Sequence, residues 1–74
     1  MVVEVRLFAT FRKGRFKKRE MEFSEGSSLE ALLESLKIAR EEAGLLLLNG
    51  QYASANDKLA AHDVVSIFPL LGGG

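Results

Sequence analysis

The 74-residue chain predicts an α+β domain in which one main helix crosses one face of a mixed sheet of four to five strands. Near both ends, apolar residues recur at every second position, which is typical of strands with one buried face. Between these segments lies a leucine stripe with helical spacing, and Asn49-Gly50 marks a tight turn, because both residues tolerate positive φ. A chain of this length forms one small domain that buries about 60–65% of its unfolded surface.

The first strand is expected where Val3, Val5 and Leu7 alternate with the residues between them. Gly14 marks a turn, and a second strand is expected around Phe16–Phe23. The two strands would pair through a connection that contains most of the basic residues.

Seven of the ten basic residues lie between Arg6 and Arg19, although the net charge of the chain is zero. A run such as Arg12–Arg19 is able to contact phosphates. We favour a solvated hairpin that protects a sheet edge, a common use of lysine, and expect no nucleic-acid partner. A basic face for an acidic protein partner stays open as the alternative.

The helix is expected to begin at Ser27, which has capping-box spacing with Glu30. Four leucines follow at i, i+3, i+4 and i+7 and form one apolar stripe: Leu29, Leu32, Leu33 and Leu36. Gly44 suits the C-terminal end of the helix. A break near Lys37–Ala39 followed by a short turn is the alternative, and the pattern does not choose between the two.

The second half of the chain predicts three more strands. Leu45–Leu48 is continuously apolar, as expected inside a sheet, and Gln51–Ala53 would return after the tight turn. Ser54–His62 is expected to be irregular, with Leu59 as its apolar anchor. Val64–Phe68 forms the last strand, which Pro69 ends because proline lacks a ladder donor.

If the first and last strands pair in parallel at the centre of the sheet, the helix covers one face and the layout is the β-grasp, or ubiquitin-like, fold. We expect this domain in residues 1–68 and a flexible glycine tail in residues 69–74. Strand parity also places Phe8 and Phe68 on the face opposite the helix, because Val5, Leu7 and Ile67 occupy the buried face. Aromatic residues there would either pack under a loop or form a docking patch for a partner, and we favour the docking patch.

The last three residues, Gly72, Gly73 and Gly74, are the most informative feature for function. Glycine makes up about 7% of average sequence, so three in a row at the end occur by chance in about one chain in 3,000. Glycine does not favour an ordered fold, but a tail without Cβ atoms fits a narrow channel in another protein. From Pro69 the tail reaches about 20 Å. Leu70 and Leu71 are expected to contact the mouth of that channel, and the alternative for Leu70 is that it continues the core.

Other chemistry has little support. The chain has no cysteine, so thiolate metal sites and cysteine nucleophiles are excluded, and a reducing cytoplasm is the expected location. His62, the one histidine, is expected in a turn, as are Asp57 and Asp63, which lack calcium-loop spacing. We therefore expect no metal. No apolar run is long enough to span a membrane.

Three segments carry a resemblance to a known family: Arg6-Leu7-Phe8-Ala9, Leu48-Asn49-Gly50-Gln51, and Asp63-Val64-Val65-Ser66-Ile67-Phe68-Pro69 before the glycine end. Together they resemble the small subunit of molybdopterin synthase, and the sulfur carrier of thiamine biosynthesis is closely similar.

The resemblance implies that Gly74 is the chemical site. A separate activating enzyme would adenylate its carboxylate with ATP, a thiocarboxylate would form, and the tail would enter the large subunit of the synthase to donate sulfur. The chain itself would bind no cofactor and would not be catalytic alone. The alternatives are sulfur transfer for thiamine, a ubiquitin-like modifier joined to lysines through Gly74, and a binding module with an incidental tail.

Overall fold

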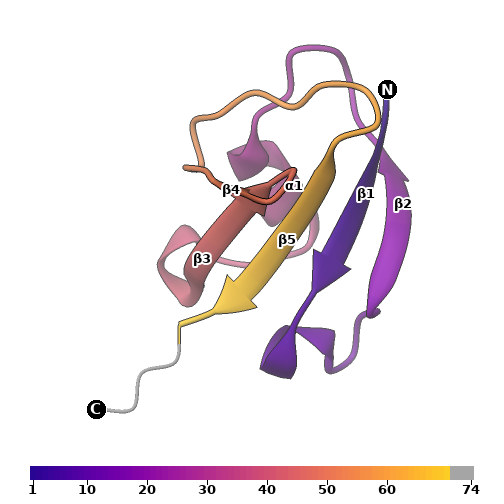
Figure 1. Ribbon diagram of the computed structural model, residues 1–74. Coiled ribbons are helices and arrows are strands. Elements are labelled where there is room, and N and C mark those ends of the chain that lie inside the picture. The colour runs from indigo at the N-terminus through magenta and orange to yellow at the C-terminus, as the bar shows by residue number, and fades with distance from the viewer. Residues whose placement is uncertain (71–74) are drawn as a thin grey trace.

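The computed structural model describes residues 1–70. In that range it contains five strands, one α-helix and two 3-10 helices (Figure 1). The elements are β1 (Val2–Leu7), η1 (Ala9–Arg12), β2 (Lys18–Glu22), α1 (Leu29–Ser35), η2 (Arg40–Glu42), β3 (Ala43–Leu48), β4 (Gln51–Tyr52) and β5 (Val64–Pro69). Sequence periodicity therefore predicted the element order correctly, apart from the 3-10 helices.

The strands form one mixed sheet in the order β2-β1-β5-β3-β4. At its centre β1 and β5 run parallel, with Val5 opposite Val65 and Leu7 opposite Ile67, and the other strand pairs are antiparallel. Figure 1 shows α1 behind this sheet, so one face is covered and the other is open. The α+β, β-grasp prediction is confirmed.

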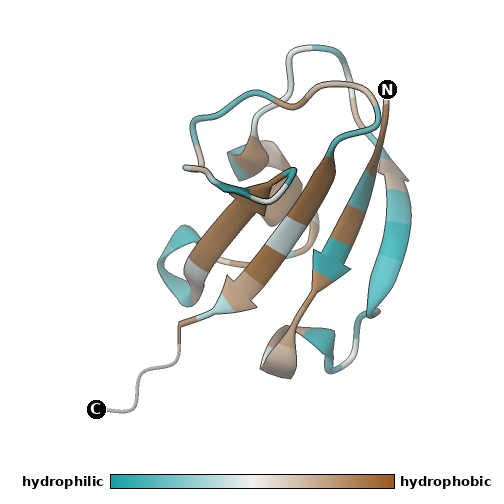
Figure 2. Cartoon of the chain, viewed as in Figure 1, coloured by the Kyte–Doolittle hydropathy of each residue, from teal (hydrophilic) through white to brown (hydrophobic). Residues whose placement is uncertain are grey.

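The core lies between α1 and the covered face of the sheet. Its sheet side consists of Val3, Val5, Leu7, Leu46, Val65 and Ile67, and its other side of Phe11, Leu29, Leu32, Leu33, Ile38 and Leu59. In Figure 2 the central strands are largely hydrophobic, whereas the edge strand β2 is mostly hydrophilic. Each fully buried apolar side chain contributes about 1.5–3 kcal/mol, so this alternation of the strand residues holds the sheet against the helix.

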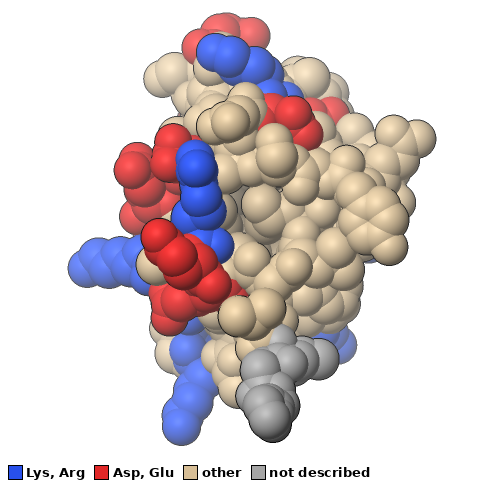
Figure 3. Space-filling model, turned by 90° about the vertical axis from the view of Figure 1, so that its left-hand side faces the viewer, with Lys and Arg blue, Asp and Glu red and all other residues tan. Residues whose placement is uncertain are grey.

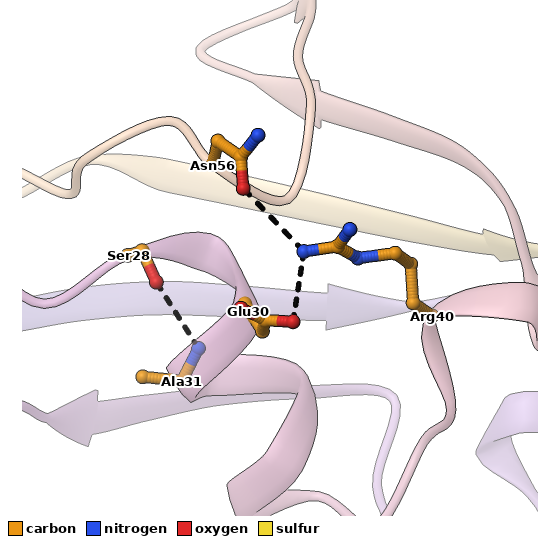
Figure 4. A network of polar contacts seen from close by, with 5 residues as sticks. All are labelled: Ser28, Glu30, Ala31, Arg40 and Asn56. Carbon is orange, nitrogen blue, oxygen red and sulfur yellow. Dashed lines mark hydrogen bonds and ion pairs between the residues drawn. The ribbon is translucent and has the colours of Figure 1, made fainter.

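The predicted capping box at Ser27 is wrong, because the helix begins one residue later. Ser28 is the N-cap, and its Oγ accepts a hydrogen bond from the backbone N–H of Ala31 at 3.4 Å (Figure 4). The backbone carbonyl of Ser27 accepts instead from the N–H of Leu59 at 2.8 Å. Long-range pairing thus decides which of two adjacent serines caps the helix.

Glu30 consequently lies in the first turn without a capping partner. Its Oε1 accepts from a guanidinium N–H of Arg40 at 2.8 Å, and the same nitrogen lies 3.4 Å from Asn56 Oδ1 (Figure 4). The side chains of Glu30 and Arg40 are about half exposed. A pair in such a position contributes at most about 1 kcal/mol.

The end of the helix follows the second of the two alternatives. Helix α1 stops at Ser35, Lys37 takes a positive φ of 60°, and η2 follows as a short turn. Ile38, between them, is 3% exposed and closes the core. Gly44 does not end the helix, since it lies inside β3.

The basic run lies along the sheet edge but is less regular than predicted. Arg12 ends η1, Gly14 takes a positive φ of 72°, and β2 begins only at Lys18 rather than at Phe16. Strand β2 is the outer strand beside β1, and its residues are exposed except for Met21, which packs partly against the core. The prediction of basic residues at an edge is therefore correct, but the connection is a helical turn and a loop.

Candidate functional site: the root of the tail and the open face

Strand β5 carries the chain to the root of the tail, which we define as Pro69 and Leu70. The N–H of Leu70 donates to the carbonyl of Glu42 at 2.9 Å, and Pro69 lies opposite Ala43 in the β3–β5 ladder. Leu70 is 65% exposed. Leu70 thus lies outside the core, where a partner is able to contact it, and its backbone is fixed by the hydrogen bond to Glu42.

Gly44 allows this close approach. The β3–β5 register shifts between Ala43 and Leu45, so Gly44 is the extra residue of a β-bulge. A Cβ on Gly44 would lie 2.7 Å from the Cα of Leu70 and 2.9 Å from the carbonyl oxygen of Pro69. These are backbone atoms that cannot rotate away, so a side chain at position 44 and the present path of the tail root are incompatible.

The remaining predicted site residues, Leu71, Gly72, Gly73 and Gly74, lie outside the described residues. Their roles in channel contact and in chemistry stay predictions.

Phe8 and Phe68 lie together on the open face, as strand parity predicted. The parallel register puts Leu7 opposite Ile67, and the N–H of Phe8 donates to the carbonyl of Ile67 at 3.2 Å. The two rings stack with their centroids 4.1 Å apart and an interplanar angle of 10°. Both side chains are half-buried rather than exposed, because each ring covers part of the other.

Apolar side chains occupy the open face from β5 to β4. Leu45 lies opposite Phe68, and Leu47 lies opposite Ser66 on one side and Tyr52 on the other. Tyr52 is 85% exposed. We call Leu45, Leu47, Tyr52 and Phe68 the apolar half of the open face. In Figure 3 the charged residues gather on one side, and an area without them extends over the other side.

Charged side chains occupy the same face from β1 to β2. Glu4 lies opposite Glu20 and Arg6 lies opposite Lys18, and the Arg6 guanidinium forms an ion pair with Glu4. The open face therefore divides into an apolar half and a charged half, and the stacked pair lies where they meet at the end of the sheet that leads to the tail.

The other candidate residues have turn roles, as predicted. His62 takes a positive φ of 68°. Asp57 accepts from the N–H of Ser54 at 3.0 Å, and Asp63 accepts from the N–H of Ala60 at 2.7 Å. Residues 1–70 contain no group of three or more histidine, cysteine or acidic residues placed to hold a metal ion.

The stacking and the bulge were not predicted. The stacking has a signal in the sequence, since a parallel β1–β5 pair with Leu7 beside Ile67 brings the next residues, Phe8 and Phe68, together. The bulge at Gly44 has no local signal, because it exists only where β5 approaches β3.

The fold and the tail-bearing strand define a ubiquitin-like β-grasp protein. Residues 5–74 match the model of the ThiS family, and the chain belongs to this family of ubiquitin-like sulfur carriers. No curated protein matches the sequence.

Solved structures agree with this assignment. The chain is similar to a putative molybdopterin converting factor, subunit 1, from Pyrococcus furiosus, with 30% identity, a TM-score of 0.77, and coverage of 93% of this chain and 97% of that one. It is also similar to a chain in a complex of subunits 1 and 2 of the molybdopterin-converting factor from Helicobacter pylori, with 25% identity, a TM-score of 0.65 and full coverage of both chains. Small archaeal modifier protein 1 from Haloferax volcanii, at 19% identity, a TM-score of 0.76, and coverage of 92% and 95%, shares the fold.

Within residues 1–70, no helix has the length and apolar character needed to cross a membrane.

Proposed function

We propose that the chain carries sulfur as a thiocarboxylate on Gly74 and donates it in molybdopterin biosynthesis, as the small subunit of molybdopterin synthase. The observation that carries this proposal is the family match, which extends through Gly72, Gly73 and Gly74. The likeness to a molybdopterin converting factor subunit 1 over nearly the whole chain supports the pathway.

The chemistry requires partner enzymes. A carboxylate is a poor acyl donor, so an activating enzyme uses ATP to convert the Gly74 carboxylate into an acyl adenylate and releases pyrophosphate. The terminal sulfur of a persulfide then attacks the acyl carbon and AMP leaves. A thiol cleaves the sulfur–sulfur bond and frees the thiocarboxylate. The absence of cysteine from the chain supports a carrier whose reactive atom is its own terminus.

The partner in sulfur donation is the large subunit of molybdopterin synthase. The H. pylori structure is a complex of subunits 1 and 2 of its converting factor, which supports such a pairing here. In the proposed complex Phe8 and Phe68 contact the large subunit, Pro69, Leu70 and Leu71 contact the mouth of its channel, and the glycines enter it. Glycine at 72 and 73 keeps the tail narrow.

The experiment is a reconstituted sulfur-loading assay with the activating enzyme, ATP and a persulfide donor. Removal of Gly74, or addition of one residue after it, is expected to abolish loading while stability stays within the roughly 0.5 kcal/mol typical of surface changes. Gly73→Val is expected to block adenylation without unfolding the domain. Full loading of the chain without Gly74 would refute the assignment of the reactive atom.

The same assay separates the alternatives by acceptor. Conversion of the cyclic pterin precursor by the loaded chain and the large subunit supports the molybdopterin role. Loading without that conversion, but with sulfur donated to thiamine precursors, assigns the thiamine role. Conjugates joined to lysines through Gly74 in cells assign the modifier role. The observation in favour of that role is the fold shared with the archaeal modifier.

A further inference from the structure

A basic hollow lies on the charged half of the open face, next to the stacked phenylalanines. It has a volume of about 480 Å³ and is lined by Arg6, Phe8, Arg12, Lys17 and Lys18. Four of these five residues are cationic and none is acidic. We call this feature the basic hollow.

Three of the four cations have no ionic partner within residues 1–70, where the two ion pairs are Arg6–Glu4 and Arg40–Glu30. Arg12, Lys17 and Lys18 are exposed. Like charges gathered on one wall repel each other, and an arriving anion relieves this repulsion. The hollow is therefore suited to negatively charged groups.

The wall of the hollow is anchored to the end of β1 and, through the stacked phenylalanines, to β5. The Nε of Arg12 donates to the carbonyl of Leu7 at 2.7 Å, and its guanidinium carbon lies 5.1 Å from the centroid of the Phe8 ring. Phe8 in turn stacks on Phe68, which directly precedes Pro69. An anionic group seated in the hollow would thus contact the ring that stacks on the residue before the tail root.

We infer that the basic hollow is an electrostatic docking site for carboxylates on the protein partner that receives the tail. This inference rests on the proposed function and adds the chemical character of the partner surface: apolar opposite Leu45, Leu47 and Tyr52, and acidic opposite the basic hollow. The juxtaposition of an apolar half and a basic hollow on one face favours a protein, because a nucleic acid would present phosphates to both.

A nucleotide fits less well. Phe68 stacks on the Phe8 ring and the Arg12 guanidinium lies over it, so the aromatic wall already has partners from the chain itself. The net charge of zero also gives no general attraction to nucleic acid. Charge complementarity therefore favours carboxylates of a protein partner, next to apolar residues of that partner that contact the apolar half of the open face.

The test compares two double charge reversals with the same change in net charge. Lys17→Glu with Lys18→Glu alters the basic hollow, and Lys13→Glu with Lys37→Glu alters two exposed lysines outside its lining. Each pair takes the net charge from zero to minus four, since each reversal subtracts two. All four residues are exposed, and melting curves verify that both variants stay folded.

The measured quantity is the rate constant of association with the large subunit, by stopped flow at several salt concentrations. Steering by complementary charge raises such rate constants about 10- to 1,000-fold and weakens with salt. We expect the hollow variant to associate at least about tenfold more slowly than the unaltered chain at low salt, and the control variant less than about threefold. The difference should shrink at high salt.

Equal slowing of both variants would overturn the inference, because net charge alone would then account for it. Tight binding of inorganic pyrophosphate that is lost in the hollow variant, with unchanged partner association, would also overturn it and assign the hollow to small anions. If the unaltered chain binds neither the large subunit nor the activating enzyme, the proposed function fails, and that result is distinct from both.

Discussion

Replacing Gly44 with alanine is the sharpest perturbation of the tail root. The added Cβ would lie 2.7 Å from the Cα of Leu70, 2.9 Å from the oxygen of Pro69 and 3.0 Å from the nitrogen of Leu70. Real Cβ atoms essentially never approach other heavy atoms closer than 3.0 Å, so the backbone of one strand must move. The root of β5 is the part that moves, because the side chain of Leu70 is largely exposed.

The expected loss of stability in Gly44→Ala follows from comparing two ways in which the structure can accommodate the added methyl group. Keeping the tail root in place forces an overpacked contact that costs about 1–3 kcal/mol. Releasing it sacrifices the hydrogen bond from Leu70 to Glu42, worth about 0.5–1.5 kcal/mol. Alanine also restricts the unfolded chain, which offsets about 0.4–1 kcal/mol. Releasing the tail root costs less free energy than keeping it in place. The net loss of stability is therefore expected to be at most about 1 kcal/mol.

The assay therefore follows the amide of Leu70 as well as stability. We expect Gly44→Ala to abolish the hydrogen-exchange protection of the Leu70 N–H while the melting temperature falls by no more than about 4–8 °C. Sulfur transfer should fall as well, because Pro69 and Leu70 would no longer be held against β3.

The matched control is Gly14→Ala. Gly14 has a φ of +72°, and a Cβ added there would have no atom within 4 Å other than those of its chain neighbours. Alanine at this position therefore causes backbone strain of about 1–2 kcal/mol but no clash. It should lower stability by as much or more, yet leave the Leu70 amide protected. Unchanged protection of Leu70 in Gly44→Ala, with stability unchanged or raised, would refute the reasoning about the bulge.

Three further substitutions test the open face and the local structure. Phe68→Ala removes the stack on Phe8 and should cost the domain clearly less than the roughly 3–5 kcal/mol of a buried phenylalanine. It should weaken binding to the large subunit by more than about 1 kcal/mol; a collapse of melting would make Phe68 a core residue instead. Ser28→Ala should cost about 0.5–1 kcal/mol in urea unfolding, since its capping bond is long, and no loss would mean that the cap is not formed. Asn49→Ala removes two hydrogen bonds of 2.9 Å: the Asn49 Nδ2 donates to Asp63 Oδ1, and its Oδ1 accepts from the backbone N–H of Val64. It should cost about 2 kcal/mol, and a neutral result would show that the turn does not depend on that side chain.

Features set by local periodicity were predictable from the sequence. Alternation along β1 and β5 follows from pleat geometry alone, so the buried positions of Val5 and Ile67 and the opposite placement of Phe8 and Phe68 were predicted correctly. The turn at Asn49 was likewise predicted, and Asn49 adopts the positive φ that the turn requires, 53°.

Features that depend on contacts between distant segments were not predictable. The N-cap is Ser28 rather than the predicted Ser27, because the backbone of Ser27 pairs with Leu59 across the fold. The bulge at Gly44 requires β5 beside β3. The basic hollow forms because the connection after β1 turns into a 3-10 helix that places Arg12 over Phe8, whereas the sequence favoured a simple hairpin.

The candidate site was predictable to the same extent. Strand parity predicted the positions of Phe8 and Phe68 correctly, and Leu70 is exposed, whereas docking of a partner by these residues stays a prediction. The mutual shielding of the two rings was not foreseen, since parity defines a face but not the distance between two side chains on it. The chemical role of Gly74 stays a prediction that chemistry must test.

Intact mass spectrometry of the chain isolated from its own cells is the direct test of sulfur carriage on Gly74. We expect a population whose mass is raised by the replacement of one oxygen with one sulfur. Fragmentation should place the sulfur on Gly74, and cells that lack the activating enzyme should lack this population. A Gly74 carboxylate that stays unmodified in cells actively making molybdopterin would show that Gly74 does not carry the sulfur.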